Sequence, residues 1–523
     1  MRRTGKCWEA ALLINNLIDS EDMKQMIARW FSMVFLLLAV MACETVHPDE
    51  GKDEKSDKVS LMRFSFTTSD NPSLGSSSSA VQANNYYCIT VPEGTDRSRL
   101  VPEILYSDGA SVFIDEKPYA KGTAYDFSGN VQHIRIVSES GARTASYNVL
   151  VKTGNSYIDT QVYEFMNDFH IPGVSISIMK GTEVKYSSGY GFAVQEDETR
   201  TTPDHLFRMA SISKQFCTMC IMTLKEEGRL KLDDKVFGEN GILKGIYHNV
   251  TPYHENITVR HLLSHSSGIC KGLNDPCFTN SYRFYSGTTN PVPTDTLIQR
   301  TLNDRQTPYY DGTMDWSPGM GYNYSNVGFC ILHRIVEVIS GKDYESYLKE
   351  DVLSKMGVTD THIGGYQYER RANECVYYMQ ADGNGYANPL RELAGAAGII
   401  TSTNQMMRVL TFMDGDDTIP DIFSYETLQE MYTPYQYSGT GTYGASYKRY
   451  GLGWRMNHSS LFQGAHYHGG NIAGTATIWA GNTNTHMSGA FVCNSRAYNS
   501  NSTGDIDDNM YVLLNRFMNY FDN

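Results

Sequence analysis

The two-residue period of β-strands runs through the chain from about Val59 to Lys152, and no helical pattern interrupts it. The segments "VQHIRIV" and "YNVLVK" alternate in polarity, and the turn sequences "SDG", "DFSGN" and "SESGA" divide this stretch. Residues 59–154 are therefore predicted to form a small β-sandwich of immunoglobulin-like type with seven strands. The stretch has no cluster of Asp, His or Cys that could do chemistry. We expect a spacer or binding module whose partner is unknown.

The rest of the chain, residues 155–523, mixes helical and strand-like segments. Helical spacing in "YIDTQVYEFMNDF" is followed by two strands in "GVSISIMKGTEVKYSSGYG", joined by a Lys-Gly turn. Near the other end, "GLGWRM", "TATIWA" and "GAFVCN" look like strands, and "DIDDNMYVLLNRFMNYF" looks like an amphipathic helix. The chain is thus predicted to be multi-domain, with an α+β domain after the sandwich. We expect an antiparallel sheet flanked by helices, with a mostly helical subdomain inserted between about Leu230 and Gly395.

Residues 1–43 have the pattern of an export leader. From Met23 the sequence "MKQMIARWFSMVFLLLAVMAC" has basic residues before an apolar run that is too short for a membrane span. Ala42 directly before Cys43 is similar to the cleavage site of bacterial lipoproteins, and the alternative is a plain signal peptide. We expect translation to start at Met23 and Cys43 to be lipidated, with residues 44–58 as a flexible tether. The protein would be exported and held on the membrane of a bacterial cell envelope by its lipid.

Charge and cysteine content narrow the possible partners and bonds. The chain has 58 acidic and 44 basic residues, a net charge of −14, and no basic run that could neutralise a phosphate backbone. Nucleic acid is therefore not expected as a partner. Of the 10 cysteines, Cys270 and Cys277 bracket a short loop and form the pair that we propose as a disulfide in an oxidising compartment.

The segment "MASISKQF" sets Ser211 three residues before Lys214, and the apolar sequence after it predicts a buried helix that ends near Gly228. At the start of this helix, unpaired backbone N–H groups and the helix dipole would stabilise a developing oxyanion. Lys214 would lie beside the serine hydroxyl, where desolvation favours a neutral amine that can act as a base. The alternative is a capping serine with a surface lysine.

Two later segments favour the catalytic reading of Ser211. The sequence "PGMGYNYSNVGF" sets Tyr324 and Asn326 on a tight loop directly before a predicted helix. The sequence "HYHGGNIAG" presents His468 on a predicted strand that would run past the serine. A phenol, an amide and an imidazole would then converge on the Ser-Lys pair.

Two other patterns are better explained without chemistry. Ser346 and Lys349 repeat the Ser-x-x-Lys spacing in "SYLK", but the surrounding helix "KDYESYLKED" is polar and a solvated face explains it. His261 and His265 in "HLLSH" have the spacing of a helical zinc site, yet Leu262 stands where such a site has its catalytic Glu. We expect these histidines to make framework hydrogen bonds.

The elements S-x-x-K, Y-S-N and H-x-G in this order resemble the serine β-lactamase-like hydrolases, the group of class C β-lactamases, D,D-carboxypeptidases, D-aminopeptidases and related esterases. Framework segments such as "ITVRHLLSHSSGI", "AAGIITSTNQMMRVL" and "YGLGW" extend the resemblance over about residues 155–520. It implies that Ser211 attacks a carbonyl carbon while Lys214 and Tyr324 share the proton transfers. An acyl-enzyme would form and water would release it.

The same resemblance implies the supporting groups. Asn326 would orient Lys214, His468 would line the cleft opposite, and the backbone N–H of Ser211 would form part of the oxyanion hole. No metal and no organic cofactor is needed. The remaining implied contacts lie on one strand, with the second oxyanion donor at the backbone of Asn471 and substrate contacts at Gly469 and Gly470.

We therefore expect a serine hydrolase that acts through an acyl-enzyme on an ester, amide or D-amino-acid peptide in the cell envelope. Gly469 stands where β-lactam and D-alanyl enzymes of the family carry a Thr whose hydroxyl holds the substrate carboxylate. We expect weak β-lactamase activity, a wider cleft, and a preference for substrates without a free carboxylate. The alternatives are a true β-lactamase or D,D-carboxypeptidase, and a catalytically silent surface binding lipoprotein.

Overall fold

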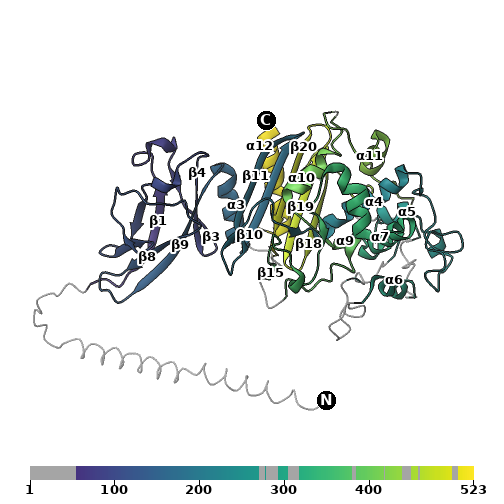
Figure 1. The fold of residues 1–523 in the computed structure, drawn as a ribbon, viewed down its shortest axis with the longest axis horizontal. Helices are drawn as coiled ribbons and strands as arrows, with labels where there is room; N and C mark the ends of the chain where they lie inside the picture. Colours follow the sequence, from purple (N-terminus) through teal and green to yellow (C-terminus); the bar gives the residue numbers. More distant parts are fainter. Residues whose placement is uncertain are drawn as a thin grey trace, which may run out of the picture.

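The computed structural model describes residues 55–269, 277, 292–303, 317–379, 384–416, 418–438, 449–456, 460–496 and 504–522. An N-terminal all-β region lies beside a larger mixed α/β region (Figure 1). Cys43 and Cys270 fall outside the described residues, so the lipidation and the disulfide stay predictions. Within the described part of the chain, no helix has the length and apolar character that a membrane crossing needs.

The N-terminal region consists of two sheets around an apolar core. Phe64, Phe66 and Phe127 meet edge to face at its centre. The all-β prediction is confirmed, but the predicted number of seven strands is wrong, because strands of two residues have no detectable period. One sheet has the order β2 (Ser78–Ser79), β1 (Leu61–Phe66), β5 (Glu103–Tyr106), and the other has the order β3 (Val81–Ala83), β4 (Tyr86–Val91), β9 (Thr144–Thr153), β8 (Gln132–Val137), β6 (Ser111–Ile114), β7 (Lys117–Pro118).

Strands β4 and β9 pair in parallel and are buried on both faces. Ile89 and Val149 face the N-terminal core. Cys88 and Leu150, on the opposite face, belong to the core of the α/β region. The N-terminal region therefore packs directly on the α/β region, which explains why "YNVLVK" departs from strict alternation at Leu150.

A buried polar contact also joins the two regions. Asp159, in α3 (Ser156–Asp168), is fully buried. Its carboxylate lies 3.0 Å from the Thr90 hydroxyl and 3.2 Å from Lys152 Nζ, both in the N-terminal region. The Tyr190 hydroxyl donates to the same carboxylate from 2.6 Å. Breaking a buried ion pair of this kind costs about 3–5 kcal/mol, so this contact helps to fix the two regions against each other.

The α/β region is built on a seven-stranded sheet in which all neighbours are antiparallel. Helices α3 and α12 (Ile506–Asp522) cover one face, and α10 (Thr403–Thr411) and α4 (Ser213–Glu226) lie on the other (Figure 1). The predicted antiparallel sheet flanked by helices from both ends is confirmed. The strand order is β12 (Thr199–Arg200), β11 (Glu183–Val194), β10 (Gly173–Lys180), β20 (Met487–Cys493), β19 (Thr475–Asn482), β18 (His466–Ile472), β17 (Arg455–Met456).

The regular elements in the described part of the segment between α4 and α10 are mostly helices joined by loops, in line with the predicted insertion. The predicted strand "GLGWRM" shrinks to the two residues of β17. The helices are α5 (Val259–Leu263), α6 (Thr294–Asn303), α7 (Asn326–Ser340), α8 (Tyr344–Tyr347), α9 (Ala394–Ala397), and beyond α10 there is α11 (Tyr425–Tyr432). Short strands complete the region: β13 (Phe207–Arg208), β16 (Ile399–Thr401) and β14 (His362–Ile363) form one sheet, and β15 (Tyr378–Met379) pairs with β21 (Ser495–Arg496).

Candidate active site

Ser211 lies in the short 3-10 turn η3 (Ala210–Ile212) that leads into α4. Throughout the fully described stretch 206–224, Ser211 alone is not buried. Ala210 has a φ of +46°, in the left-handed region, which costs about 1–3 kcal/mol for a residue with a side chain. The turn thus holds the Ser211 hydroxyl at an opening in an otherwise closed core. The predicted buried helix after Ser211 is confirmed.

Lys214, in the first turn of α4, is completely buried. Its Nζ lies 3.2 Å from Ser211 Oγ, 2.6 Å from Asn326 Oδ1 and 2.8 Å from the carbonyl of Ala396. An ammonium group has three donors, and each of these contacts can accept one. A neutral amine would keep the contacts to Asn326 and Ala396 and turn its lone pair toward the serine hydroxyl. The geometry therefore allows Lys214 to exchange a proton with Ser211.

Tyr324 approaches Ser211 from the start of α7. Its hydroxyl donates to Ser211 Oγ over 2.7 Å. Ser325 caps α7, since its hydroxyl accepts the backbone N–H of Gly328 at 3.0 Å, and Asn326 is the first residue of the helix. One helix start therefore sets both the phenol and the amide that the sequence predicts. The four predicted groups Ser211, Lys214, Tyr324 and Asn326 are brought together.

His468 lies on β18 and is 1% exposed. Its Nε2 is 3.1 Å from the Tyr450 hydroxyl, which is also 3.1 Å from His265 Nε2. His265 Nδ1 accepts the backbone N–H of Ser325 at 3.1 Å, so its proton sits on Nε2 and points to Tyr450. Tyr450 then donates to His468, whose Nδ1 donates to the carbonyl of Gly469 at 2.6 Å. Every hydrogen bond in this series from His265 to Gly469 has a donor and an acceptor when both imidazole rings are neutral.

The electrostatics agree with neutral rings. Burial, followed by the charge of Lys214, holds the pKa of His265 well below its usual value. Burial, followed by the charges of Arg455 and Lys214, does the same to the pKa of His468. The His265 ring packs against the Tyr324 ring, with 4.3 Å between the two centroids. The hydrogen-bonded series that begins at His265 therefore helps to hold the phenol in position.

His261 and His265 do not form a zinc pair. His261 Nδ1 accepts the backbone N–H of Thr258 as part of the capping box of α5. The framework interpretation of both histidines is confirmed. His265 also packs against the Tyr324 ring, a contact that the sequence does not predict.

Strand β18 passes directly beside the backbone of Ser211. A side chain at Gly470 would lie 2.9 Å from the Ser211 backbone nitrogen and would collide with the Met209 carbonyl. Only glycine therefore lets the strand approach the serine. Asn471 follows on the same strand, and its side-chain amide donates to Asp507 over 2.9 and 3.0 Å.

The prediction that Gly469 widens the cleft is wrong. A side chain at this position would point at Tyr511 of α12, whose hydroxyl already fills that space. Successive residues of a strand face opposite sides, so Gly469 faces away from the side that His468 and Gly470 share. Tyr511 takes up the volume that a threonine would occupy.

Arg455 carries no motif that singles it out in the sequence. It lies on β17 and pairs with Tyr467, one residue before His468. Its Nε is buried and has no hydrogen-bond partner among the described residues. Burial acts to lower the pKa of Arg455, but the neighbouring Tyr322 and Tyr511 raise it above its usual range, so the guanidinium keeps its charge. A cation therefore lies beside the site, close to Tyr324 and His468.

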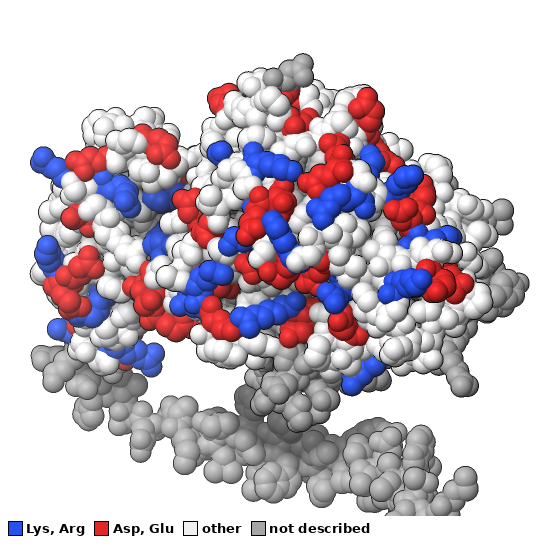
Figure 2. All heavy atoms as spheres, turned by 45° about the vertical axis from the view of Figure 1, so that its right-hand side comes forward, with Lys and Arg blue, Asp and Glu red and all other residues white. Residues whose placement is uncertain are grey.

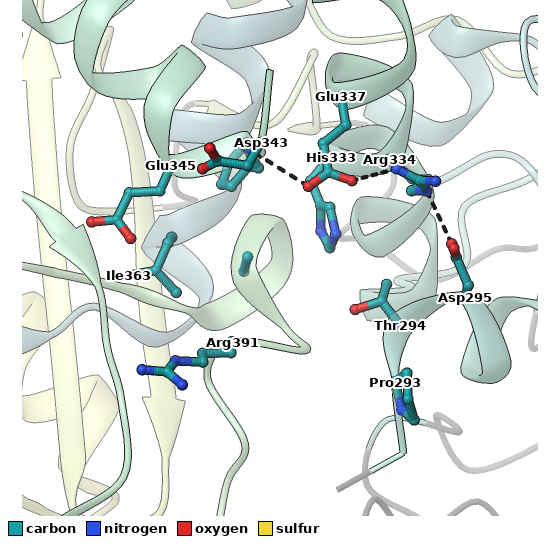
Figure 3. Close-up of a pocket in the computed structure, with 12 residues that line it drawn as sticks. Pro293, Thr294, Asp295, His333, Arg334, Glu337, Asp343, Glu345, Ile363 and Arg391 are labelled. Atoms are coloured by element: carbon teal, nitrogen blue, oxygen red, sulfur yellow. Dashed lines mark hydrogen bonds and ion pairs between the residues drawn. The ribbon is translucent and has the colours of Figure 1, made fainter. Parts of the chain in front are cut away.

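A separate hollow of about 430 Å³ lies near α7 and α8 (Figure 3). Arg334 there pairs with Asp295 at 3.0 Å and with Glu337 at 2.7 Å. Arg391 also borders it and is paired with Glu369 at 2.7 Å. None of the predicted catalytic residues lines this hollow.

Surface charge is mixed on one face of the molecule. On the face that Figure 2 shows, basic and acidic side chains alternate, and no patch of one sign gathers over the α/β region. Such a surface lacks the continuous positive stripe that a phosphate backbone requires.

The sequence of the α/β region matches a known family. A family model described as beta-lactamase matches residues 158–512. The chain belongs to the beta-lactamase family. A second model, described as SGBP, N-terminal, matches residues 65–151. These two matches confirm the predicted serine β-lactamase-like family with an N-terminal module.

Relatives and solved structures agree with this assignment. Protein flp of Staphylococcus aureus (strain COL) is 25% identical over 265 residues, which are 50% of this chain and 49% of that protein. Penicillin-binding protein 4* of Bacillus subtilis (strain 168) is 23% identical over 61% of this chain and 67% of its own length. The chain thus spans about half the length of the Staphylococcus relatives that it matches.

Two solved structures share the fold. The octameric penicillin-binding protein homologue from Pyrococcus abyssi has a TM-score of 0.51 and 24% identity, over 66% of this chain and 74% of that one. The D-amino acid amidase from Ochrobactrum anthropi SV3, complexed with L-phenylalanine amide, has a TM-score of 0.53 and 21% identity, over 70% of this chain and 100% of that one. At these identities the likeness concerns the fold alone.

Proposed function

We propose that the protein is a hydrolase in which Ser211 is the nucleophile and forms an acyl-enzyme. The observation that carries the proposal is the position of the Ser211 hydroxyl, 2.7 Å from the Tyr324 hydroxyl and 3.2 Å from Lys214 Nζ. A serine at its ordinary acidity is a weak nucleophile, and a neighbouring group that can take its proton is what activation needs. Membership of the beta-lactamase family supports the same reaction class.

The reaction follows from these contacts. Ser211 Oγ attacks the substrate carbonyl while its proton passes to Lys214 or Tyr324. The tetrahedral oxyanion accepts hydrogen bonds from the backbone N–H groups of Ser211 and Asn471, and a proton from Tyr324 goes to the leaving group. Water then attacks the acyl carbon, loses its proton to the same pair, and frees the serine. Asn326 keeps Lys214 in place through both halves.

For the substrate we propose an amide, peptide or ester with a carboxylate near the scissile bond. The charge of Arg455 supports this choice, because a half-buried guanidinium whose Nε lacks a partner among the described residues is suited to binding an anion. The expectation of substrates without a carboxylate depended on the missing threonine hydroxyl at Gly469 and on the absence of a compensating cation. The charge of Arg455 argues against the second premise. The solved amidase carries a D-amino acid in its name, which supports D-amino-acid peptides as the first compounds to test.

A substrate panel tests the proposal. Purified protein would be assayed with p-nitrophenyl esters, D-amino-acid amides, D-alanyl-D-alanine peptides and nitrocefin. We expect turnover of at least one amide, peptide or ester and its loss in Ser211→Ala. Arg455→Met should lower kcat/KM for a peptide with a free carboxylate by about tenfold or more, as expected for one charged hydrogen bond, and spare a neutral ester. A folded wild-type protein that turns over no compound would support the silent binding protein instead.

We also propose that the protein is exported and anchored in the cell envelope through a lipid on Cys43. The apolar run that ends in "LLLAVMAC" and the charged segment after it support this location. Cys43→Ala should release the protein from the membrane fraction in soluble form. Unchanged fractionation of the variant, or a native N-terminus without lipid by mass spectrometry, would contradict the anchor.

A further inference from the structure

A second group of polar side chains lies at the end of the sheet where β19 turns into β20. Asp414 and Asp416 lie in the loop after α10, and His486 lies in the turn between the two strands. One ligand atom from each of these residues lies within 4.8 Å of the others. Thr477 of β19 contacts the Met209 carbonyl, next to the turn that holds Ser211. Strand β19 ends five residues later at Asn482, beside this group, so the group lies about 17 Å from the active site along the strand.

Several atoms of this group are buried without a hydrogen-bond partner. The Asp414 side chain is 2% exposed and its Oδ2 atom has no donor among the described residues. The Nδ1 atom of His486 and the Oδ1 atom of Asp421 are buried and unpartnered as well. Asp421 is adjacent, because its carboxylate accepts hydrogen bonds from the backbone of Gly415 and Asp414. Buried polar atoms of native proteins nearly always have partners, so three orphans side by side indicate a missing one.

The surrounding backbone fixes these side chains in place. Asp414 Oδ1 accepts the backbone N–H of Asp416 at 2.9 Å, and Asp416 Oδ1 accepts that of Thr418 at 2.8 Å. The carbonyl of His486 accepts the backbone N–H of Gly181, in the turn between β10 and β11, at 2.7 Å. Each carboxylate therefore uses one oxygen to hold the loop and keeps the other for a ligand.

We propose that Asp414, Asp416 and His486 bind a divalent transition-metal cation. Carboxylate oxygens alone would suit Ca²⁺ or Mg²⁺, whereas an imidazole in the set favours Zn²⁺ over these ions. The cation would supply the partner that Asp414 Oδ2 and His486 Nδ1 lack. It would tie the loop after α10 to the turn between β19 and β20, so its effect is on stability and not on the reaction.

Zinc binding to the full chain in detergent tests this proposal. After chelator treatment, we expect isothermal titration calorimetry with ZnCl₂ to give one site per chain, and thermal unfolding to shift upward as zinc is added. Ca²⁺ should bind at least tenfold more weakly. His486→Gly and Asp416→Asn should each weaken zinc binding by about tenfold or more. Glycine suits position 486, whose φ is +55°.

His170→Gly is the matched control. His170 is an exposed histidine with a φ of +53°, and its replacement should leave zinc affinity unchanged. Ester hydrolysis by each variant reports that it is folded, and Asp416→Asn serves if His486→Gly fails to fold. No zinc binding by the wild type, equal affinity for Ca²⁺, or zinc affinity that survives both ligand variants would overturn the site.

Discussion

The Ser-x-x-Lys spacing occurs twice in this chain, and the two copies lie in different surroundings. Lys214 is completely buried and contacts Ser211, Asn326 and the backbone of α9. The Lys349 side chain is 38% exposed, and its Nζ lies 3.1 Å from His362 Nδ1. The comparison teaches that spacing alone places a lysine near a serine. Burial of the lysine and a phenol from a second segment distinguish the Ser211 pair from the Ser346 pair.

The helices that carry the two copies explain the difference. Helix α4 has all its residues from Ser213 to Leu224 buried, because it lies between the sheet and the helical part of the α/β region. Helix α8 is one turn long, and Asp343 caps it by accepting the backbone N–H of Ser346 at 3.0 Å. Ser346 therefore sits in the first turn of a surface helix, where a capping arrangement accounts for it fully.

Removing the two serines should give the largest contrast. Ser211→Ala should lower kcat/KM by at least about 10⁴-fold, since it removes the nucleophile of a unit that acts together. Its thermal stability should stay within about 1 kcal/mol of the wild type, because the hydroxyl lies at an opening in the core. Ser346→Ala should keep full activity. Equal losses in both variants would break the comparison.

Removing the two lysines should give the next largest contrast. Lys214→Met should lower kcat by about 10²–10⁴-fold, the usual contribution of a positioned acid or base, with little change in KM. Lys349→Met is the control and should stay within about twofold of the wild type, as expected for a surface change. Adding Lys214→Met to Ser211→Ala should cause little further loss. Retention of a tenth of the activity by Lys214→Met would exclude it from proton transfer.

The phenol should have a smaller effect than the lysine. Tyr324→Phe should lower kcat by about 10²-fold, because the ring stays packed on His265 while the proton donor to the leaving group is lost. Tyr347→Phe, next to Ser346, is the matched control, since its buried hydroxyl has no hydrogen-bond partner in the described part of the chain. Pre-steady-state assays of both variants would show whether acylation is the step that slows.

The smallest expected effect is on stability against pH. His265 and His468 have pKa values lowered by burial, so the folded protein resists binding protons that the unfolded chain accepts. Their contribution to stability is complete above the unfolded pKa of about 6.5 and declines as the pH falls below it. The thermal midpoint should therefore fall between pH 6.5 and pH 4.

A variant makes this pH effect specific to the active site. His468→Gln removes one of the two buried rings, so the thermal midpoint of this variant should fall less steeply with falling pH. His133→Gln, at an exposed position of β8, is the control and should show the same pH dependence as the wild type. A thermal midpoint that is constant down to pH 4 would contradict neutral rings behind Lys214.

Ser211 and the three groups around it could be predicted because each lies at the start of a helix or in a short motif next to one. Tyr450 and Arg455 could not, because their partners come from segments far apart in the sequence. The alternation along β18 already predicts that Gly469 and Gly470 face opposite sides. Tyr511 fills the space at Gly469 because α12 packs there, and no local sequence pattern predicts that packing.

The N-terminal region shows the same limit. Its strand period predicts an all-β fold, but the two buried faces of β9 follow from packing against the α/β region. The buried contact of Asp159 with Thr90 and Lys152 likewise joins residues that no motif connects. The immunoglobulin-like type of the sandwich and the predicted domain boundaries stay predictions.

Covalent labelling of the two serines tests the central claim most directly. The wild-type protein would be treated with a fluorophosphonate probe, digested, and mapped by mass spectrometry. We predict one adduct per chain, on the peptide that contains Ser211, and its absence in Lys214→Met as well as in Ser211→Ala. An adduct on Ser346, or labelling of Ser211 that does not depend on Lys214, would contradict the account.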